Sequence, residues 1–265
     1  MTITFLSDFG HDDEFVGVVH GVIGRLAPEV RVIDLTHGIA RGEVRAGALA
    51  LTRAIQYMPH GVVLAVVDPG VGTSRRAIAA RTPAGFFVGP DNGLLSPAVA
   101  MVGGADLIVS IENPEVRIPS AGATFDGRDL FAPAAALLAS GEATIEDLGP
   151  IVDPDSVLPL LLPLPEVEDG KAVGEAWWVD HFGNVQTNIS PEDLAMIGLA
   201  PGSRMGVRVG SQEYQVAYVS SYGEVGEGEP LAHVDSSGLV ALAVRSGRAD
   251  ETFRLSAGTA VTFHP

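Results

Sequence analysis

The sequence predicts an α/β domain with a mostly parallel sheet, followed by a smaller all-β domain that resembles a barrel. In the first part of the chain, short apolar runs alternate with amphipathic segments, which is the βαβ rhythm of a parallel sheet. In the last part, seven short β-rich runs are separated by glycine turns, a pattern typical of a small barrel or sandwich. A proline-rich stretch lies between the two parts.

The elements of the first part follow from hydrophobic periodicity. Apolar runs of strand length alternate with stretches whose apolar residues recur at helical spacing. We expect strands over Ile3–Leu6, Val30–Leu35, Val62–Val67, Ala77–Ala80 and Leu107–Ser110, and helices over Glu14–Leu26, Glu43–Tyr57 and Arg128–Ala139.

Residues 150–170 mark the boundary between the domains. Five prolines and several acidic side chains fall in this stretch, which cannot sustain a helix or a central strand. We therefore place the α/β domain at 1–148, a linker at 149–170 and the β-rich domain at 171–265. In the last, strands are expected over Ala172–Val179, Asn184–Ile189, Ser203–Val209, Glu213–Val219, Pro230–Val234, Leu239–Val244 and Thr259–Phe263.

Composition excludes several function classes. The formal net charge is −17, a field that repels nucleic acid, so no nucleic-acid partner is expected. The chain has no cysteine, which excludes disulfides, thiolate metal sites and a cysteine nucleophile. The N-terminal residues do not resemble a signal peptide and no run has membrane-spanning length, so we expect no membrane partner and a cytoplasmic location.

The loop Asp68–Arg76 directly follows an apolar strand and carries a carboxylate, two glycines and a guanidinium. Open α/β sheets bind ligands at the carboxyl ends of their strands. Gly70 and Gly72 allow the backbone to approach a ligand closely. The alternative is an Asp68–Arg75 ion pair that only stabilises the loop. The loop lacks the GK[ST] of a phosphate-binding loop, and no GxGxxG follows the first strand, which argues against a nicotinamide cofactor.

A second acidic segment, Ser7–Asp13, follows the first strand. An ionised carboxylate such as Asp8 can accept two hydrogen bonds, which suits vicinal ribose hydroxyls. In the alternative interpretation, Asp12 or Asp13 caps the next helix. An acidic cluster with His11 is also compatible with Mg²⁺, but no histidine or carboxylate spacing supports a metal, and none is expected.

Three further segments carry turn or cap chemistry. Val88–Leu95 is interpreted as a tight turn that leads into a helix. In Thr124–Asp129, Asp126 or Asp129 either caps the following helix or contributes to a site. The segment Val179–Asn184 combines an aspartate, a phenylalanine and an amide on a β-turn, which is either an ordinary hairpin turn or part of a site.

Taken together and in order, these segments resemble the S-adenosylmethionine (SAM) hydroxide adenosyltransferases, the adenosine-forming SAM hydrolases, which are relatives of fluorinases and chlorinases. The resemblance covers nearly the whole chain. It rests on SDFG…FVG at Ser7–Gly17, DLTH at Asp34–His37, VVDPGVG…R at Val66–Arg75, VGPDNGLL at Val88–Leu95, TFDGRDLFAPAAA at Thr124–Ala136, DHFGN at Asp180–Asn184 and SSG at Ser236–Gly238.

The resemblance implies a hydrolase that converts SAM to adenosine and L-methionine by attack of water or hydroxide on the ribose C5′. The implied reaction requires no cofactor, since SAM is its substrate, and no metal. It further implies a homotrimer whose active sites lie between the N-terminal domain of one subunit and the C-terminal domain of the next. The implied catalytic residues are Asp68, Arg75 and Asp126.

The implied substrate contacts come from both domains. Asp8 corresponds to the ligand of the ribose hydroxyls and Asp13 to the methionine side, while Thr124 and Phe125 belong to the segment that carries Asp126. Asp180 corresponds to the ligand of the amino acid ammonium, and Phe182 and Asn184 to contacts with adenosine. The adenine end is assigned to Tyr222, Ser237, Arg245 and Ser246.

The chain departs from the family pattern at one position. The family's water-activating set is Asp, Arg and His, and Asp126 stands where that histidine falls. Either Asp126 replaces it as the base, or Asp68 alone removes the proton. Fluorinases and chlorinases carry an aromatic residue where this chain has Asp68, and a carboxylate there repels halide. Halide adenosyl transfer and a non-catalytic adenosine- or SAM-binding module are the alternative functions.

Overall fold

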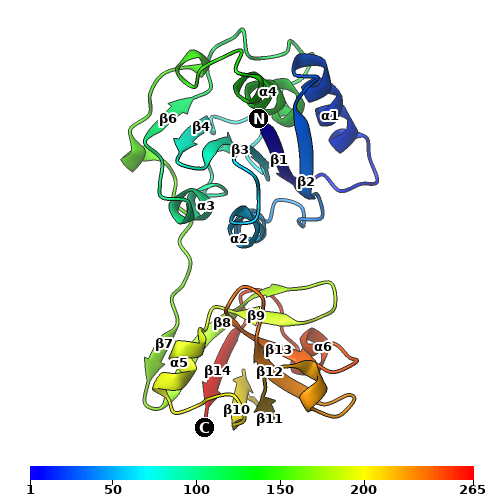
Figure 1. Ribbon diagram of the computed structural model, residues 1–265, viewed down its shortest axis with the longest axis vertical. Coiled ribbons are helices and arrows are strands. Elements are labelled where there is room, and N and C mark those ends of the chain that lie inside the picture. Colours follow the sequence, from blue (N-terminus) through cyan, green and yellow to red (C-terminus); the bar gives the residue numbers. More distant parts are fainter. The chain divides into compact units, whose positions relative to one another are not determined.

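The computed structural model describes all of residues 1–265. The chain forms two compact units, Met1–Leu160 and Leu161–Pro265, which are described separately (Figure 1). The division between them falls within the stretch 149–170 that the sequence predicts to be a linker. No helix in the structure has the length and apolar character needed to cross a membrane.

The first unit contains a six-stranded sheet in the order β2-β1-β3-β5-β4-β6. The four strands β2, β1, β3 and β5 are parallel to one another, whereas β4 is antiparallel to both β5 and β6. The predicted α/β fold with a mostly parallel sheet is confirmed. The strands are β1 (Thr2–Ser7), β2 (Arg31–Thr36), β3 (Gly61–Val66), β4 (Ala77–Thr82), β5 (Gly85–Pro90) and β6 (Leu107–Ser110).

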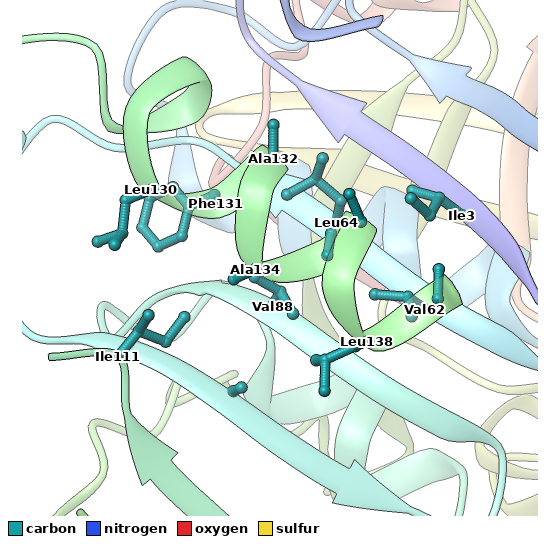
Figure 2. Close-up of a cluster of buried hydrophobic side chains, with 14 of the residues drawn as sticks. Ile3, Val62, Leu64, Val88, Ile111, Leu130, Phe131, Ala132, Ala134 and Leu138 are labelled. Atoms are coloured by element: carbon teal, nitrogen blue, oxygen red, sulfur yellow. The ribbon is translucent and has the colours of Figure 1, made fainter. Parts of the chain in front are cut away.

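Helices cover both faces of this sheet. One core joins α1, η1 and α4 to one face, and a second core joins α2 and α3 to the other. Figure 2 shows the first core, in which Leu64 and Val88 of the sheet face Ala134 and Leu138 of α4. The helices are α1 (Phe15–Leu26), α2 (Val44–Ile55), α3 (Ser96–Met101), η1 (Gly127–Phe131), α4 (Ala132–Ser140) and η2 (Glu146–Leu148).

Burial explains why these segments form these elements. Every residue of β3 is buried, as expected for a central strand with helices on both faces. The sequence of such a strand is a continuous apolar run rather than an alternation of apolar and polar residues. Helix α1 buries only one side, through Val19, Val22 and Ile23, which is the stripe that a helical repeat produces. The sequence patterns therefore report burial directly.

In the first unit, the strand β5 is an element that the sequence analysis missed. The interpretation of Val88–Leu95 as a turn was wrong for its first three residues, because β5 runs through Pro90 and the turn follows it. Pro90 closes the strand, where the missing N–H of a proline costs no ladder hydrogen bond. The predicted helix does begin after the turn, at Ser96.

The second unit is a barrel. Seven strands close a ring in the order β8-β9-β13-β12-β11-β10-β14, and β14 pairs back with β8. All pairings in the ring are antiparallel except that of β11 with β12. The strands are β7 (Glu166–Glu168), β8 (Lys171–Val179), β9 (Val185–Thr187), β10 (Arg204–Val209), β11 (Gln212–Tyr218), β12 (Pro230–Val234), β13 (Val240–Val244) and β14 (Ala260–His264).

Short helices connect the strands of the barrel. They are α5 (Pro191–Met196), η4 (Tyr222–Glu224) and α6 (Ala249–Phe253). In the proline-rich stretch, η3 (Pro154–Ser156) is a single turn, and β7 pairs only with β8, at the edge. That stretch holds no central strand, because a proline has no backbone N–H with which to hydrogen-bond a neighbouring strand.

The central strand β3 provides a test of the core. Leu64 is fully buried, so Leu64→Ala is expected to lower the free energy of unfolding by about 2–5 kcal/mol, through lost burial and the cavity left behind. Urea unfolding measures this loss. In the matched control Leu161→Ala, the side chain is 86% exposed, and the change should stay within about 0.5 kcal/mol. Equal losses in the two variants would contradict this description of the core.

Candidate active site

The carboxyl ends of β1 and β3 lie side by side and position two of the predicted loops. The two strands are parallel neighbours, with Ser7 opposite Val66. The loop with Asp8 follows β1 and the loop with Asp68 follows β3, so both leave the sheet at the same edge. The Oδ2 atom of Asp8 accepts a hydrogen bond from the backbone N–H of Gly42 at 2.8 Å.

The structure brings the three predicted catalytic side chains together. Arg75 donates from Nε to Oδ1 of Asp68 at 3.1 Å and from Nη2 to Oδ2 of Asp68 at 2.5 Å. The same Nη2 donates to Oδ2 of Asp126 at 2.8 Å. The guanidinium also lies over the ring of Phe131, with 5.3 Å from Cζ to the ring centroid. Arg75 thus joins the loop after β3 to the start of η1.

These three side chains are nearly removed from solvent. Their exposed fractions are 9% for Arg75, 5% for Asp68 and 10% for Asp126. Burial raises the pKa of Asp68, Arg75 opposes this rise, and the charge of Asp126 adds to it. The net result is a carboxylate whose pKa lies above its ordinary value, which suits a group that accepts a proton during a reaction.

A fourth charged side chain, Arg117, completes the cluster. Its Nη2 atom lies 2.9 Å from Oδ1 of Asp126, and 42% of its side chain is exposed. The sequence analysis missed Arg117. It belongs to none of the motifs, and no periodicity links it to Asp126.

Glycines allow the loops of this cluster to pack. Gly72 has a φ of +78°, and a Cβ there would lie 3.1 Å from the carbonyl oxygen of Ala123. A Cβ on Gly127 would lie 2.8 Å from the ring of Phe9 and 3.2 Å from that of Phe125. Neither position has room for a side chain, so both glycines are needed for the close approach.

Three aromatic rings pack beside Asp126. Phe125 meets Phe9 and Phe15 edge-on, with centroid separations of 5.6 and 5.0 Å. The guanidinium of Arg128 lies 5.1 Å from the centroid of the Phe125 ring. The neighbouring Thr124 is exposed. Phe9 and Phe15 were not among the predicted site residues, although both stand within the SDFG…FVG motif.

The capping alternatives do not describe the acidic residues. Helix α1 has Glu14 at its N-cap with no side-chain capping bond, and Asp13 is exposed. Asp126 occupies the N-cap position of η1 but makes no side-chain capping bond either. Asp129 instead accepts from both Nε and Nη2 of Arg128. Burial raises the pKa of Asp129, but hydrogen bonds from Arg128 and Ser120 outweigh it and the net shift is downward.

The DLTH motif supports the loop that carries Asp8. The hydroxyl of Ser7 lies 2.7 Å from Nδ1 of the buried His37. Oδ1 of Asp34 lies 3.0 Å from Nε2 of His37 and 2.8 Å from Nε2 of His20. Burial lowers the pKa of His37, against the effect of Asp34. The backbone N–H of Gly10 donates to the carbonyl of His37, which fixes the loop after β1.

In the second unit, the turn between β8 and β9 carries three of the predicted residues. Oδ1 of Asp180 accepts from the backbone N–H of Asn184, and Oδ2 accepts from its side-chain amide, both at 2.8 Å. Phe182 at the tip is 72% exposed. Gly183 has a φ of +86°, and a Cβ there would clash with Arg248. The turn is thus braced from within, while its phenylalanine ring stays largely exposed and meets only the edge of the His181 ring.

The remaining predicted residues lie in loops of the same unit. The ring of Tyr222 packs at a tilt against that of His233, with a centroid separation of 4.9 Å. Burial and the charges of Asp180 and Asp235 raise the pKa of Tyr222. The other three are held through the backbone or lie exposed: Ser237 donates its N–H to Asp235, Arg245 donates from Nη1 to the carbonyl of Val225, and Ser246 is an exposed residue with a φ of +58°.

The geometry therefore gives two sets of residues. The first unit holds a buried charged cluster beside aromatic rings, and the second holds a braced turn with an exposed phenylalanine and a tyrosine that packs against a histidine. No group of three or more histidine, aspartate or glutamate side chains is arranged to hold a metal ion.

Comparisons with known proteins identify the family of both domains. Residues 3–149 match the SAM hydroxide adenosyltransferase N-terminal domain, and residues 174–262 match the C-terminal domain of the same family. The chain is 46% identical over 256 residues to an (R)-S-adenosyl-L-methionine hydrolase from Salinispora tropica, covering 97% of this chain and 95% of that protein. It is 40% identical to the hydrolase of that name from Thermus thermophilus, with 98% of each chain covered.

More distant relatives and solved structures extend the comparison. A fluorinase from Nocardia brasiliensis is 28% identical over 287 residues, covering 98% of this chain and 95% of that protein. The crystal structure of an uncharacterized conserved protein from Thermotoga maritima has a TM-score of 0.92 at 38% identity, covering 99% of this chain and all of that one. Both family domains match in order and together cover most of the sequence, so the chain belongs to the SAM hydroxide adenosyltransferase family.

Proposed function

We propose that this protein hydrolyses SAM to adenosine and L-methionine. The observation that carries the proposal is the buried cluster of Asp68, Arg75 and Asp126 in a chain that is 46% identical, over nearly its full length, to a protein named as an (R)-SAM hydrolase. The cluster supplies a proton acceptor and a cation at one point, which is what attack by water requires.

The chemistry of SAM explains why such a cluster suffices. Cleavage at C5′ releases a neutral thioether from a sulfonium, so the leaving group needs no proton. Water is a poor nucleophile because its pKa is about 15.7, and the site must therefore orient it and accept its proton. In the proposal, Arg75 stabilises the developing hydroxide and a carboxylate takes the proton.

Substrate contacts are proposed for both sets of residues. Asp8 would accept hydrogen bonds from the ribose hydroxyls, Asp13 would line the methionine side, and Thr124 and Phe125 would contact the substrate next to Asp126. From the second unit, Asp180 would bind the ammonium group, and Phe182 and Asn184 would contact adenosine. Tyr222 and Ser237, with Arg245 and Ser246, would surround the adenine.

The proposed assembly is a homotrimer in the cytoplasm, with each site formed by the N-terminal domain of one subunit and the C-terminal domain of its neighbour. This proposal rests on the family resemblance. It accounts for the division of the proposed contacts between two domains of the chain.

The reaction itself is tested with isotope-labelled water. Purified protein incubated with SAM in halide-free buffer containing ¹⁸O water should form adenosine labelled at its 5′ oxygen, as measured by mass spectrometry. Added chloride or fluoride should give no 5′-halogenated adenosine, because the Asp68 carboxylate repels halide at the point of attack. Unchanged SAM would contradict hydrolysis, and a halogenated nucleoside would favour halide transfer.

Asp68→Asn tests the proton acceptor. The amide keeps the shape of Asp68 but cannot accept the proton, so kcat should fall by about 10²–10⁴-fold while KM changes little. Asp106→Asn is a matched control, because Asp106 forms an Arg–Asp pair with Arg81 that is largely exposed and lies outside the cluster. Similar losses in the two variants would argue for a general structural effect.

The assembly is tested by mass and by mixing subunits. Sedimentation should give about three times the chain mass of 27.5 kDa. An Asp68→Ala variant and a Phe182→Ala variant, each nearly inactive alone, should regain activity when their subunits are mixed and reassembled, because some sites then receive both intact halves. A monomer, or no recovery in mixtures with a proven trimer, would contradict shared sites.

A further inference from the structure

Four charged side chains alternate in sign along the proposed site. Asp68 and Arg75 lie on the loop after β3, Asp126 stands at the start of η1, and Arg117 comes from the segment between β6 and η1. Arg75 bonds both aspartates, and Arg117 lies 2.9 Å from the far oxygen of Asp126. The order of charges is Asp68, Arg75, Asp126, Arg117.

We propose that Arg117 is a positioning residue: it holds the Asp126 carboxylate in its contact with Arg75 and so leaves Asp68 as the group that accepts the proton from water. The proposal rests on the proposed hydrolysis, and it decides between the two candidate bases that the sequence leaves open. It assigns to Asp126 the role of an anchor for Arg75.

The geometry distinguishes the two carboxylates. Asp126 has a different arginine on each oxygen, Arg117 at Oδ1 and Arg75 at Oδ2. Asp68 meets the single guanidinium of Arg75 with both of its oxygens. With two cations against one, Asp126 is the carboxylate whose anionic form is better compensated.

The charge count leads to the same assignment. Two aspartates and two arginines sum to zero, whereas the cluster without Arg117 carries one excess negative charge in a site that is nearly closed to solvent. A buried group of like charges relieves its repulsion by binding a proton. Burial already raises the pKa of Asp68, and the charge of Asp126 raises it further, so the site favours protonation at Asp68.

The other charged groups near Asp126 are engaged elsewhere. On η1, Arg128 bonds both oxygens of Asp129, and Asp129 also feels the charge of Arg117. On the loop after β1, Asp8 accepts from the backbone of Gly42. Arg117 and Arg75 are thus the cations in direct contact with Asp126.

In the proposed step, water is the nucleophile and Asp68 is the base. An O–H bond of water breaks and its proton passes to the Asp68 carboxylate, while the oxygen forms a bond to C5′. The C5′–S⁺ bond breaks and its electron pair stays on sulfur. The products are adenosine and the neutral thioether of methionine, and the proton on Asp68 returns to solvent after the products leave.

The test is the pH profile of kcat/KM for adenosine formation. The base must be ionised, so activity falls as pH drops through the pKa of Asp68, which lies above the ordinary 3.8. Arg117→Met removes one positive charge and leaves the cluster with a net negative charge, so this acid limb should move to higher pH. The expected shift is about half to one pH unit, which is moderate because Arg117 is partly exposed. Arg117→Lys keeps the charge and should restore the limb.

A second pair of variants identifies the base. Asp126→Asn removes the charge that raises the pKa of Asp68, and it also removes an anchor of Arg75, so activity should fall but stay measurable, with its acid limb at lower pH. In the Asp126→Asn background, Arg117→Met should shift the limb far less than it does alone, because its anionic partner is gone. A merely structural role for Arg117 would move kcat or stability without this pattern.

The outcomes separate the two proposals. If the unmodified protein forms no adenosine at any pH, the proposed hydrolysis fails. If it does, the proposal for Arg117 is overturned by an unchanged limb in Arg117→Met, by equal shifts in Arg117→Met and Arg117→Lys, or by complete loss of turnover in Asp126→Asn. The last result would make Asp126 the base.

Discussion

The ion pairs of Arg75 with Asp68 and Asp126 are the constraint on which the proposed site depends. Two carboxylates removed from water in one place repel each other, and their burial carries a large desolvation cost unless a cation joins them. The planar fork of arginine can bond one carboxylate through two nitrogens and still reach a second. The three side chains therefore have to arrive together, and removing Arg75 would leave two buried carboxylates without their shared cation.

The fold meets this requirement through its parallel strands. Since β1 and β3 are neighbours with the same direction, the loops that follow them begin at one edge of the sheet, where open α/β sheets place ligands. Gly72 brings the loop after β3 close to the backbone before η1, and Gly127 lets η1 start against the ring of Phe9. The buried contact of Ser7 with His37 then fixes the direction in which the loop with Asp8 leaves the sheet.

The comparisons place hydrolases and fluorinases among the relatives of one chain. A shared fold supports different chemistries when a few side chains at the site differ. Two residues of this chain differ from the pattern that the resemblance implies for its relatives. The halide-using relatives have an aromatic residue at the position of Asp68, and the hydrolases have a histidine at the position of Asp126. Under the proposed hydrolysis, carboxylates at both positions would favour water over an anionic nucleophile. The contact of Arg117 with Asp126 is the basis for proposing Asp68 as the group that accepts the proton.

The sequence by itself determined the two-domain plan, most strands, the loop with Asp68 and Arg75, and the ordered motifs of the family, because periodicity and short motifs report local burial and turn chemistry. It misassigned the start of Val88–Leu95, where a strand runs up to Pro90. Only the tertiary structure decided that Arg117 faces Asp126, that Phe9 and Phe15 pack on Phe125, and that β14 closes the barrel on β8. These contacts join residues that are separated along the chain, and no local pattern encodes which distant partner a side chain meets.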